Sequence, residues 1–299
     1  MAIYLTAIRM LGRLILEWFR ATPPARPRVT WIRRVVFGLA LLGIVCIAYG
    51  FWIEPYWPQV TVVSLSTPKL PPGARPIRIV HISDIHCDPT PRLEERLPGL
   101  IQRQHPDLIV FTGDSINSPQ ALPVFKRCMA HCAQIAPTFA VKGNCDAWFW
   151  KGQDLFGGTG VRELNGEAVK LDLSGEKAPL WITGVAVESE DRIDQALAEV
   201  PKGALNIFLY HYPDRIFSIA QHKVDLYCAG HTHGGQVALP FYGALVTLSK
   251  LGKRFEAGLY RVDETWLYVN RGIGMEIFAP RVRFCARPEI TVIELVPRK

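Results

Sequence analysis

The apolar positions from residue 77 onward alternate between short runs and longer stretches with helical spacing. Helical spacing over 92–104 and 122–135 separates the first three short runs. Runs of this length predict strands, and the runs at 259–262 and 266–269 are spaced as a hairpin around Asp263-Glu264. The predicted strands cover 77–82, 107–111, 139–141, 205–210, 225–229, 259–262, 266–269 and 290–295. Alternating strands and helices predict an α/β fold, with more strands in the second half.

The pattern before residue 77 is different and predicts a membrane anchor. Residues 35–53 contain 19 consecutive uncharged positions, and a spanning helix needs about 20 apolar residues. Arg33-Arg34 precede this run, and aromatic residues of the kind that anchor at a bilayer surface follow it. We therefore expect an anchor helix over 35–57. A buried core helix and a cleaved signal peptide are the alternatives, although no small-residue cleavage site follows.

The anchor is flanked by an arm and a linker. In the arm, residues 1–34, positions 2–19 place arginines on one helical face and apolar side chains on another. This predicts an amphipathic helix lying in the membrane interface. Residues 58–76, which end in a proline-rich connector, are expected to link the anchor to one domain over 77–299.

The charge of the chain is concentrated in this arm. The net charge is +7, and residues 1–34 hold seven arginines and a single glutamate. The remaining chain is near neutral, which argues against a nucleic-acid partner and favours the lipid bilayer as partner of the arm. The arginine excess predicts a cytoplasmic N-terminus and a domain on the far side, whereas seven cysteines without a disulfide pattern favour a reducing compartment. The sequence leaves the side of the membrane open.

Polar residues that bind metals follow five of the predicted strands. Because ligand sites in α/β sheets lie beyond the carboxyl ends of strands, we expect these side chains to meet. Carboxylates with imidazoles suit Mn, Fe, Zn or Co, and seven ligands suit two metal ions that share a carboxylate. Each motif alone is ordinary, since a lone histidine is often structural and Gly-Asp is often a turn. The seven candidate ligands are Asp84, His86, Asp114, Asn144, His211, His231 and His233.

The ordered set Asp-x-His, Gly-Asp, Gly-Asn-x-Asp, His, Gly-His-x-His resembles the calcineurin-like metallophosphoesterases over residues 77–296. The resemblance implies a four-layer αββα sandwich of two mixed sheets with flanking helices, here preceded by the membrane helix. It also implies two divalent metal ions, with manganese the first expectation, and a hydroxide that attacks a phosphoester. One metal would be held by Asp84, His86 and His233, the other by Asn144, His211 and His231, with Asp114 bridging. Catalysis would then depend on Asp84, Asp114, Asn144 and His231.

Three further motifs resemble the membrane-associated bacterial branch of this family, namely GHTHGGQ at 230–236, NRGIG at 270–274 and RPEI at 287–290. Some members of that branch hydrolyse UDP-2,3-diacylglucosamine in lipid A biosynthesis. This implies an inner-membrane phosphodiesterase or pyrophosphatase acting on a lipid-linked or nucleotide-linked phosphoester. The alternatives are a phosphatase for phosphoproteins or small phosphomonoesters and a non-catalytic metal-binding scaffold. The sequence predicts no oligomeric state.

The stretch VKGNCD at 141–146 has a cysteine where many relatives have a histidine. A thiol donates only weakly and carries no positive charge, and loss of a general acid lowers rates by about 10²–10⁴-fold. That loss matters least for leaving groups that need no proton, which favours diester or pyrophosphate substrates. The alternative is that Cys145 is a tolerated small residue while Arg271, Arg281 or Arg283 supplies the charge. We expect substrate contacts from Cys145, Asp146, Trp148 and Arg271, with Trp148-Phe149-Trp150 on a loop that faces lipid.

Overall fold

The computed structural model describes residues 9, 12, 27–173, 180–276 and 280–298. The chain divides into two compact units, Met1–Ile53 and Glu54–Lys299. Apart from residues 9 and 12, the predicted interfacial helix over 2–19 lies outside the described residues.

The first unit is described mainly by helix α2 (Pro27–Trp52). The helix begins earlier than expected, at a proline whose fixed φ suits the first helical position. Within the described residues, the stretch Arg34–Tyr56 is long and apolar enough to cross a membrane, with a mean hydropathy of 2.3. A signal sequence near an N-terminus passes the same test of length and hydropathy.

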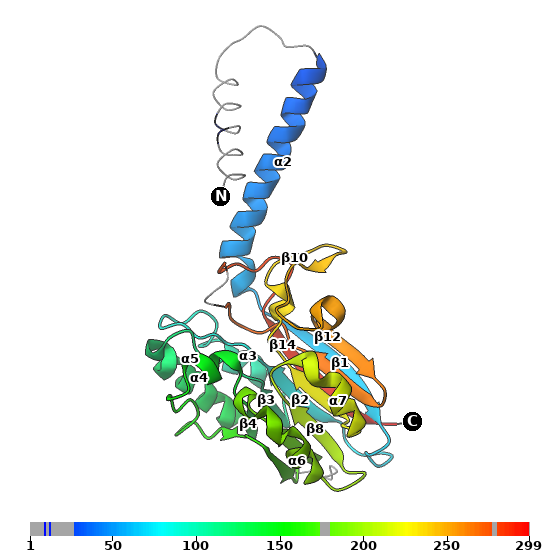
Figure 1. The fold of residues 1–299 in the computed structure, drawn as a ribbon. Coiled ribbons are helices and arrows are strands. Elements are labelled where there is room, and N and C mark those ends of the chain that lie inside the picture. Colours follow the sequence, from blue (N-terminus) through cyan, green and yellow to red (C-terminus); the bar gives the residue numbers. More distant parts are fainter. Residues whose placement is uncertain (1–8, 10–11, 13–26, 174–179, 277–279, 299) are drawn as a thin grey trace. The chain divides into compact units, whose positions relative to one another are not determined.

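The second unit contains two six-stranded sheets, and both are mixed, as expected (Figure 1). The first has the order β1 (Gln59–Thr67), β14 (Glu289–Pro297), β2 (Ile77–Ile82), β3 (Leu108–Phe111), β4 (Thr138–Ala140) and β5 (Arg162–Glu163). The second has the order β12 (Gly258–Val262), β13 (Thr265–Val269), β9 (Leu226–Ala229), β8 (Leu205–Leu209), β7 (Leu180–Gly184) and β6 (Glu167–Leu171). A separate short pair is formed by β10 (Ala238–Leu239) and β11 (Gly243–Ala244). Strands β2 to β5 are parallel, and so are β7, β8, β9 and β13.

Three apolar clusters hold the layers together. The central cluster, which includes Ile79 and Ile207, takes side chains from both sheets. A second cluster packs β2 and β3 against α3 (Leu97–Gln102) and α4 (Leu122–Ile135). The third packs β8 and β9 against α6 (Ile193–Ala198) and α7 (Ile216–Gln221). Each sheet therefore has one face toward the other sheet and one face covered by helices.

The expected linker over 58–76 differs from the structure. Residues 59–67 form β1, which runs parallel to β14 along nine residue pairs. Burial alternates along β1, with Thr61, Val63 and Leu65 on the inward face, whereas Val60 and Val62 are exposed. The domain therefore starts before residue 77, and only the proline-rich stretch connects β1 to β2.

Two helical expectations also differ. Helix α3 is shorter than the predicted 92–104 because the Glu94 carboxylate accepts hydrogen bonds from the backbone amides of Arg92 and Leu93, which hold a turn there. The residues after β4, expected as a loop, form helix α5 (Asn144–Phe149). Strands β5, β6 and β7 were not expected at all.

Candidate metal centre

All seven candidate ligands follow strands whose carboxyl ends meet at one edge of the two sheets. Strands β2, β3 and β4 of the first sheet supply four of them, and β8 and β9 of the second sheet supply three. Six are buried, and His231 is half-buried. They are Asp84 and His86 after β2, Asp114 after β3, Asn144 after β4, His211 after β8, and His231 and His233 after β9.

Three groups of side chains each bring their ligand atoms within 4.8 Å of one another, and two of these groups consist of candidate ligands alone. In the first, His233 Nε2 lies 3.2 Å from His86 Nε2 and 3.3 Å from Asp84 Oδ1. In the second, His211 Nε2 lies 3.3 Å from Asp114 Oδ2 and 4.0 Å from Asp84 Oδ1. Asp84 belongs to both groups, and Asp114 also approaches His86 Nε2, at 3.5 Å. The two carboxylates therefore lie between the two groups of imidazoles.

Hydrogen bonds turn the Nε2 atoms of two histidines toward these carboxylates. The Nδ1 atom of His211 lies 2.7 Å from the Thr112 carbonyl oxygen, which can only accept, so Nδ1 carries the proton. His86 Nδ1 lies 3.1 Å from Asn117 Oδ1, and the Asn117 amide nitrogen is oriented by donating to the His86 carbonyl oxygen. Such partners fix the tautomer that binds a metal. Asn117 was not found from the sequence, where it is one polar residue in a loop.

The donor set fits a divalent cation. His211 Nε2 and Asn144 Oδ1 are buried and have no hydrogen-bond partner in the described part of the chain. Buried polar atoms without a partner are rare because they lose their hydration, and a bound ion is one way to satisfy them. The buried carboxylates of Asp84 and Asp114 lie close together and also need a positive charge beside them. Oxygen and imidazole ligands together suit a first-row transition metal.

The protonation states of His231 and His233 favour metal binding. Burial lowers the pKa of His231 to about 4, with His211 adding to the effect, and burial likewise lowers the pKa of His233 well below its usual value. Both rings are therefore neutral near pH 7 and present a lone pair. Burial raises the pKa of Asp84. Burial would lower the pKa of His211, but the neighbouring Asp114 and Asp84 carboxylates raise it to about 10.

Five of the seven ligands have left-handed backbone. Their φ angles are 47°, 41°, 59°, 71° and 52° for Asp84, His86, Asp114, His231 and His233. Side chains other than glycine rarely adopt this region, and each instance costs about 1–3 kcal/mol. The surrounding structure holds these residues in place, and the turns aim consecutive ligands into one site.

Close backbone approach at Gly230 supports the same geometry. A Cβ atom there would lie 2.2 Å from Asp84 Oδ2 and 2.0 Å from Ser83 Oγ. We expect Gly230→Ala to displace the Asp84 carboxylate and lower metal affinity about 10–100-fold, as loss of a supporting contact does. Isothermal titration of the metal-free protein with Mn²⁺ measures this. Gly99→Ala is the control, since nothing lies within 4 Å of a Cβ there, and equal affinities of the two variants would contradict the assignment.

Asp146 supports the centre from behind and does not line the cavity described below. Its buried carboxylate accepts hydrogen bonds from the backbone amides of Asp114, Ser115 and Gly143, at 2.8, 2.9 and 3.0 Å. Burial and the Asp114 charge raise the pKa of Asp146 to about 6. These contacts orient the turns that carry Asp114 and Asn144, whereas the expected substrate contact of Asp146 has no support.

Cys145 lies in the cavity wall beside the ligands. Its backbone amide donates to Asp114 Oδ1 at 2.8 Å, and its thiol accepts from the Asn144 side chain at 3.5 Å. Burial, with the Asp114 and Glu276 charges, raises the pKa of the Cys145 thiol far above its usual value. The thiol is therefore neutral and a poor nucleophile. Glu276 Oε2, 3.9 Å from the sulfur, brings a further carboxylate that no sequence motif indicated.

The three arginines considered for charge have other partners. The Arg271 guanidinium binds Glu289, with NH2 and Oε1 3.2 Å apart, and Arg281 binds Asp88. Arg283 is fully buried and donates to backbone carbonyl oxygens, including those of Ala286 and Gly274. None of the three lines the cavity, so the expected substrate contact of Arg271 is not supported.

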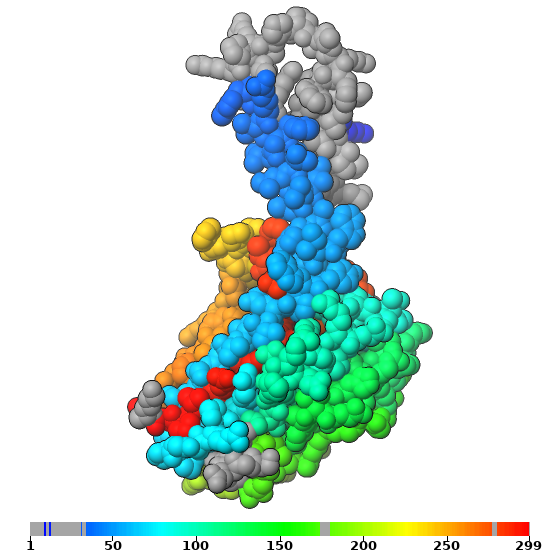
Figure 2. All heavy atoms as spheres, turned by 180° about the vertical axis from the view of Figure 1, so that it is seen from behind, coloured from blue at the N-terminus to red at the C-terminus, as the bar shows by residue number. Residues whose placement is uncertain are grey.

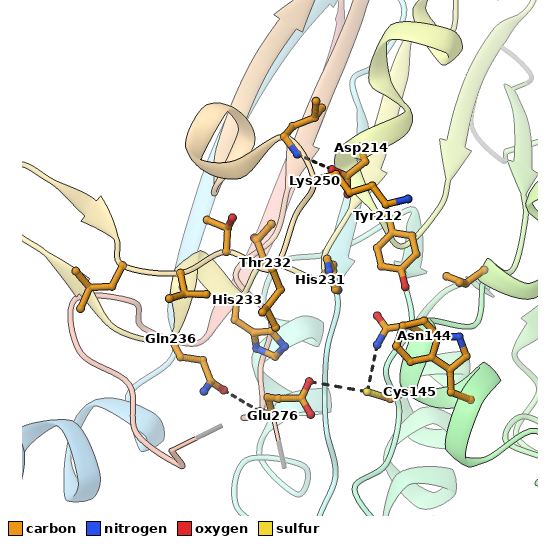
Figure 3. A pocket seen from close by; sticks show the side chains of 18 of the residues that line it. Asn144, Cys145, Tyr212, Asp214, His231, Thr232, His233, Gln236, Lys250 and Glu276 are labelled. Atoms are coloured by element: carbon orange, nitrogen blue, oxygen red, sulfur yellow. Dashed lines mark hydrogen bonds between the residues drawn. The ribbon is translucent and has the colours of Figure 1, made fainter. Parts of the chain in front are cut away.

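A cavity of about 1220 Å³ opens onto the ligands (Figure 3). Asn144, Cys145, His231 and His233 form its polar end together with Glu276. The rest of the wall is largely apolar and includes Trp148 and Phe149 from α5, which are 65% and 48% exposed. The wall also includes the apolar or aromatic residues Val187, Tyr212, Val237, Leu245, Val246, Leu248 and Leu251 and the charged residues Glu190, Asp214, Arg215 and Lys250. Trp148 thus lies in the cavity, as expected.

Comparison with known proteins agrees with this geometry. The family model of the calcineurin-like phosphoesterases matches residues 77–235. The chain belongs to this family. One relative is YkuE of Bacillus subtilis, described as an uncharacterized metallophosphoesterase. It is 30% identical over 261 residues, which cover 83% of this chain and 88% of YkuE.

Two other relatives have more specific names. Phosphodiesterase YaeI of Escherichia coli is 29% identical, covering 83% of this chain and 92% of its own. UDP-2,3-diacylglucosamine pyrophosphatase LpxG of Chlamydia trachomatis is 25% identical, covering 81% of this chain and 90% of its own. Together with the buried His/Asp groups, family membership makes this chain a metal-dependent phosphoester hydrolase. Divalent ions in such a site polarise the phosphoryl group and lower the pKa of water. The chain itself orients the ligands and keeps His231 and His233 neutral.

Proposed function

We propose that this calcineurin-like phosphoesterase is a membrane-associated phosphodiesterase or pyrophosphatase for a substrate with an apolar part. The observation that carries the proposal is the cavity, because one wall joins the metal ligands to a long apolar surface. Its volume exceeds the roughly 300–1,000 Å³ typical of small-ligand sites. An acyl-bearing phosphoester would place its phosphate at Asn144 and His231 and its apolar part against Trp148, Leu245 and Leu248.

The ligand assignment is the one that the family resemblance implies, and the group Asp84, His86 and His233 supports its first half. Asp84, His86 and His233 would hold one metal ion and Asn144, His211 and His231 the other, with Asp114 shared. Manganese is the proposed metal, because carboxylate, amide and imidazole ligands together suit it. The partnerless Asn144 Oδ1 and His211 Nε2 support the second ion.

The neutral Cys145 thiol supports a leaving group that departs without a proton. We expect Cys145→His to restore a general acid and raise the rate on glycerol 2-phosphate relative to bis-p-nitrophenyl phosphate about 10–100-fold. The ratio of the two rates measures this, with Cys145→Ser as the size-matched control that leaves it unchanged. An unchanged ratio in Cys145→His would show that the thiol position does not serve the leaving group.

The most specific form of the proposal is hydrolysis of UDP-2,3-diacylglucosamine, supported by the similarity to LpxG. The test uses purified protein with Mn²⁺ and the substrate in detergent micelles, and it follows release of UMP. We expect release that is abolished by a chelator. Turnover of bis-p-nitrophenyl phosphate alone would keep the diesterase chemistry and discard this substrate. Faster turnover of monoesters than of diesters would favour a phosphatase instead.

Localisation at the bacterial inner membrane is part of the proposal and is supported by α2. The arginine-rich arm places the domain outside the cytoplasm if α2 spans the bilayer, whereas a nucleotide-linked lipid substrate requires a cytoplasmic site. Protease accessibility of the domain in spheroplasts distinguishes the two arrangements.

A further inference from the structure

The segment after the metal ligands forms an exposed apolar hairpin. We define the apolar hairpin as residues 237–248, which contain β10 and β11. It projects from the sheets in Figure 1 and forms the yellow protrusion of Figure 2. Phe241 at its tip is fully exposed, at 112%, and five other large apolar side chains are 43–68% exposed. Those five are Leu239, Tyr242, Leu245, Val246 and Leu248.

We propose that the apolar hairpin inserts into the surface of an anionic lipid bilayer. Exposed apolar groups of this density on a soluble surface mark an interaction site. A protruding tip would need a matching pocket on a protein partner, whereas the interfacial region of a bilayer adapts to its shape.

Several backbone groups of the apolar hairpin form hydrogen bonds within the protein, as insertion into a bilayer requires. Tyr242 N donates to the Leu239 carbonyl oxygen at 3.2 Å, and Leu245 N donates to that of Val237 at 3.1 Å. Lys253 Nζ donates to the carbonyl oxygens of Tyr242 and Ala244. Backbone groups that are satisfied internally enter an apolar environment at much lower cost. The hairpin therefore exposes its apolar side chains as a fixed structure.

The charges around the apolar hairpin match anionic headgroups. Residues 237–254 contain three cations, Lys250, Lys253 and Arg254, and one acid, Glu256, packs against them with its Oε2 atom 3.6 Å from Lys253 Nζ. The net charge around the hairpin is therefore positive. Lys253 Nζ lies 3.6 Å from the centre of the Tyr242 ring, at the base of the tip. Cations beside an inserted apolar surface are attracted to anionic lipids.

The cavity connects the apolar hairpin to the candidate metal ligands. Leu245, Val246 and Leu248 belong both to the hairpin and to the cavity wall. On the opposite side, Trp148 and Phe149 are also exposed. Insertion of the hairpin would place the cavity mouth at the lipid surface, where an acyl chain could enter without crossing water.

The test measures lipid contact without turnover, so its failure is distinct from failure of the proposed function. Cys46 and Cys285 are replaced by serine in the full chain, because the other five cysteines are buried. Phe241→Cys is then labelled with a polarity-sensitive fluorophore and reconstituted into vesicles of phosphatidylethanolamine and phosphatidylglycerol. Some lipids carry a spin label near the headgroup end of the acyl chain and quench fluorophores that lie close by.

Glu264→Cys, in the turn between β12 and β13, is the matched control, since that side chain is also exposed. We expect the label at 241 to be quenched at least about twice as strongly as the label at 264, as for a group about 5–10 Å into the interface. Equal quenching of the two labels would overturn the proposal. A label at 241 that is shielded from water but not quenched by lipid would also overturn it, since a protein partner or a second copy would then cover the hairpin.

Discussion

Asp114→Ala is expected to reduce phosphodiester hydrolysis by at least about 10³-fold, because metal stabilisation of the transition state is worth several kcal/mol and each ~1.4 kcal/mol is tenfold in rate. Asp114 Oδ2 lies 3.3 Å from His211 and 3.5 Å from His86, so its carboxylate reaches ligands of both groups. The measurement is the rate on bis-p-nitrophenyl phosphate with saturating Mn²⁺, together with the metal content of the purified variant.

Two variants separate loss of the ligand from loss of the fold. Asp114→Asn can keep the oxygen that accepts the hydrogen bond from Cys145 N, so it is expected to fold normally and remain slow. Asp172→Ala, at an exposed carboxylate paired with Lys170, is expected to retain the wild-type rate. Full activity of Asp114→Ala would refute the ligand assignment.

Arg283→Met is expected to lower the free energy of unfolding of the second unit by about 3–5 kcal/mol, as removal of a buried charged partner does. Its guanidinium donates to the carbonyl oxygens of Ala286 and Gly274, at 2.7 and 3.0 Å, and also to those of Arg271 and Gly272. Methionine fills the space and removes the Arg283 donor from the carbonyl oxygens of Ala286, Gly274 and Arg271, whereas Gly272 O still accepts from Glu289 N at 3.0 Å. Thermal unfolding in one fixed detergent, followed by tryptophan fluorescence, measures the loss.

Arg281→Met is the matched control two residues away. Arg281 pairs with Asp88 at a site where its side chain is 38% exposed, so its loss should cost at most about 1 kcal/mol. Comparable melting temperatures for the two variants would contradict a structural role for Arg283.

The strand ends were predictable because two simple rules act together. Apolar runs mark strands, and parallel strands deliver the residues after their carboxyl ends to one edge. The seven candidate ligands could therefore be named from the sequence, and the structure places each of them after a strand that ends at this edge. Their role in binding metal stays a prediction. The roles of the arginines could not be predicted, because nothing in the sequence distinguishes Arg271, Arg281 and Arg283. Their partners Glu289 and Asp88 were selected by the tertiary fold, and Asp88 lies 193 residues from Arg281.

Strand β1 and Glu276 show two other limits of the sequence. The apolar residues of β1 alternate only in part, and its pairing with β14 spans 230 positions, so no local pattern indicates such a partner. Glu276 is one carboxylate in a loop, and only its approach to Cys145 gives it a place in the site. Long-range pairing of this kind is specified by the whole fold.

The left-handed backbone at five candidate ligands serves catalysis but lowers the stability of the fold. Glycine at any of these positions would adopt the same conformation without strain and would release about 1–3 kcal/mol. Such a change would also delete a candidate ligand, and at Asp84 or Asp114 it would relieve the repulsion between the two buried carboxylates. An inert and more robust version of the scaffold is thus one substitution away. Selection for hydrolytic activity would therefore be needed to retain Asp84, His86, Asp114, His231 and His233.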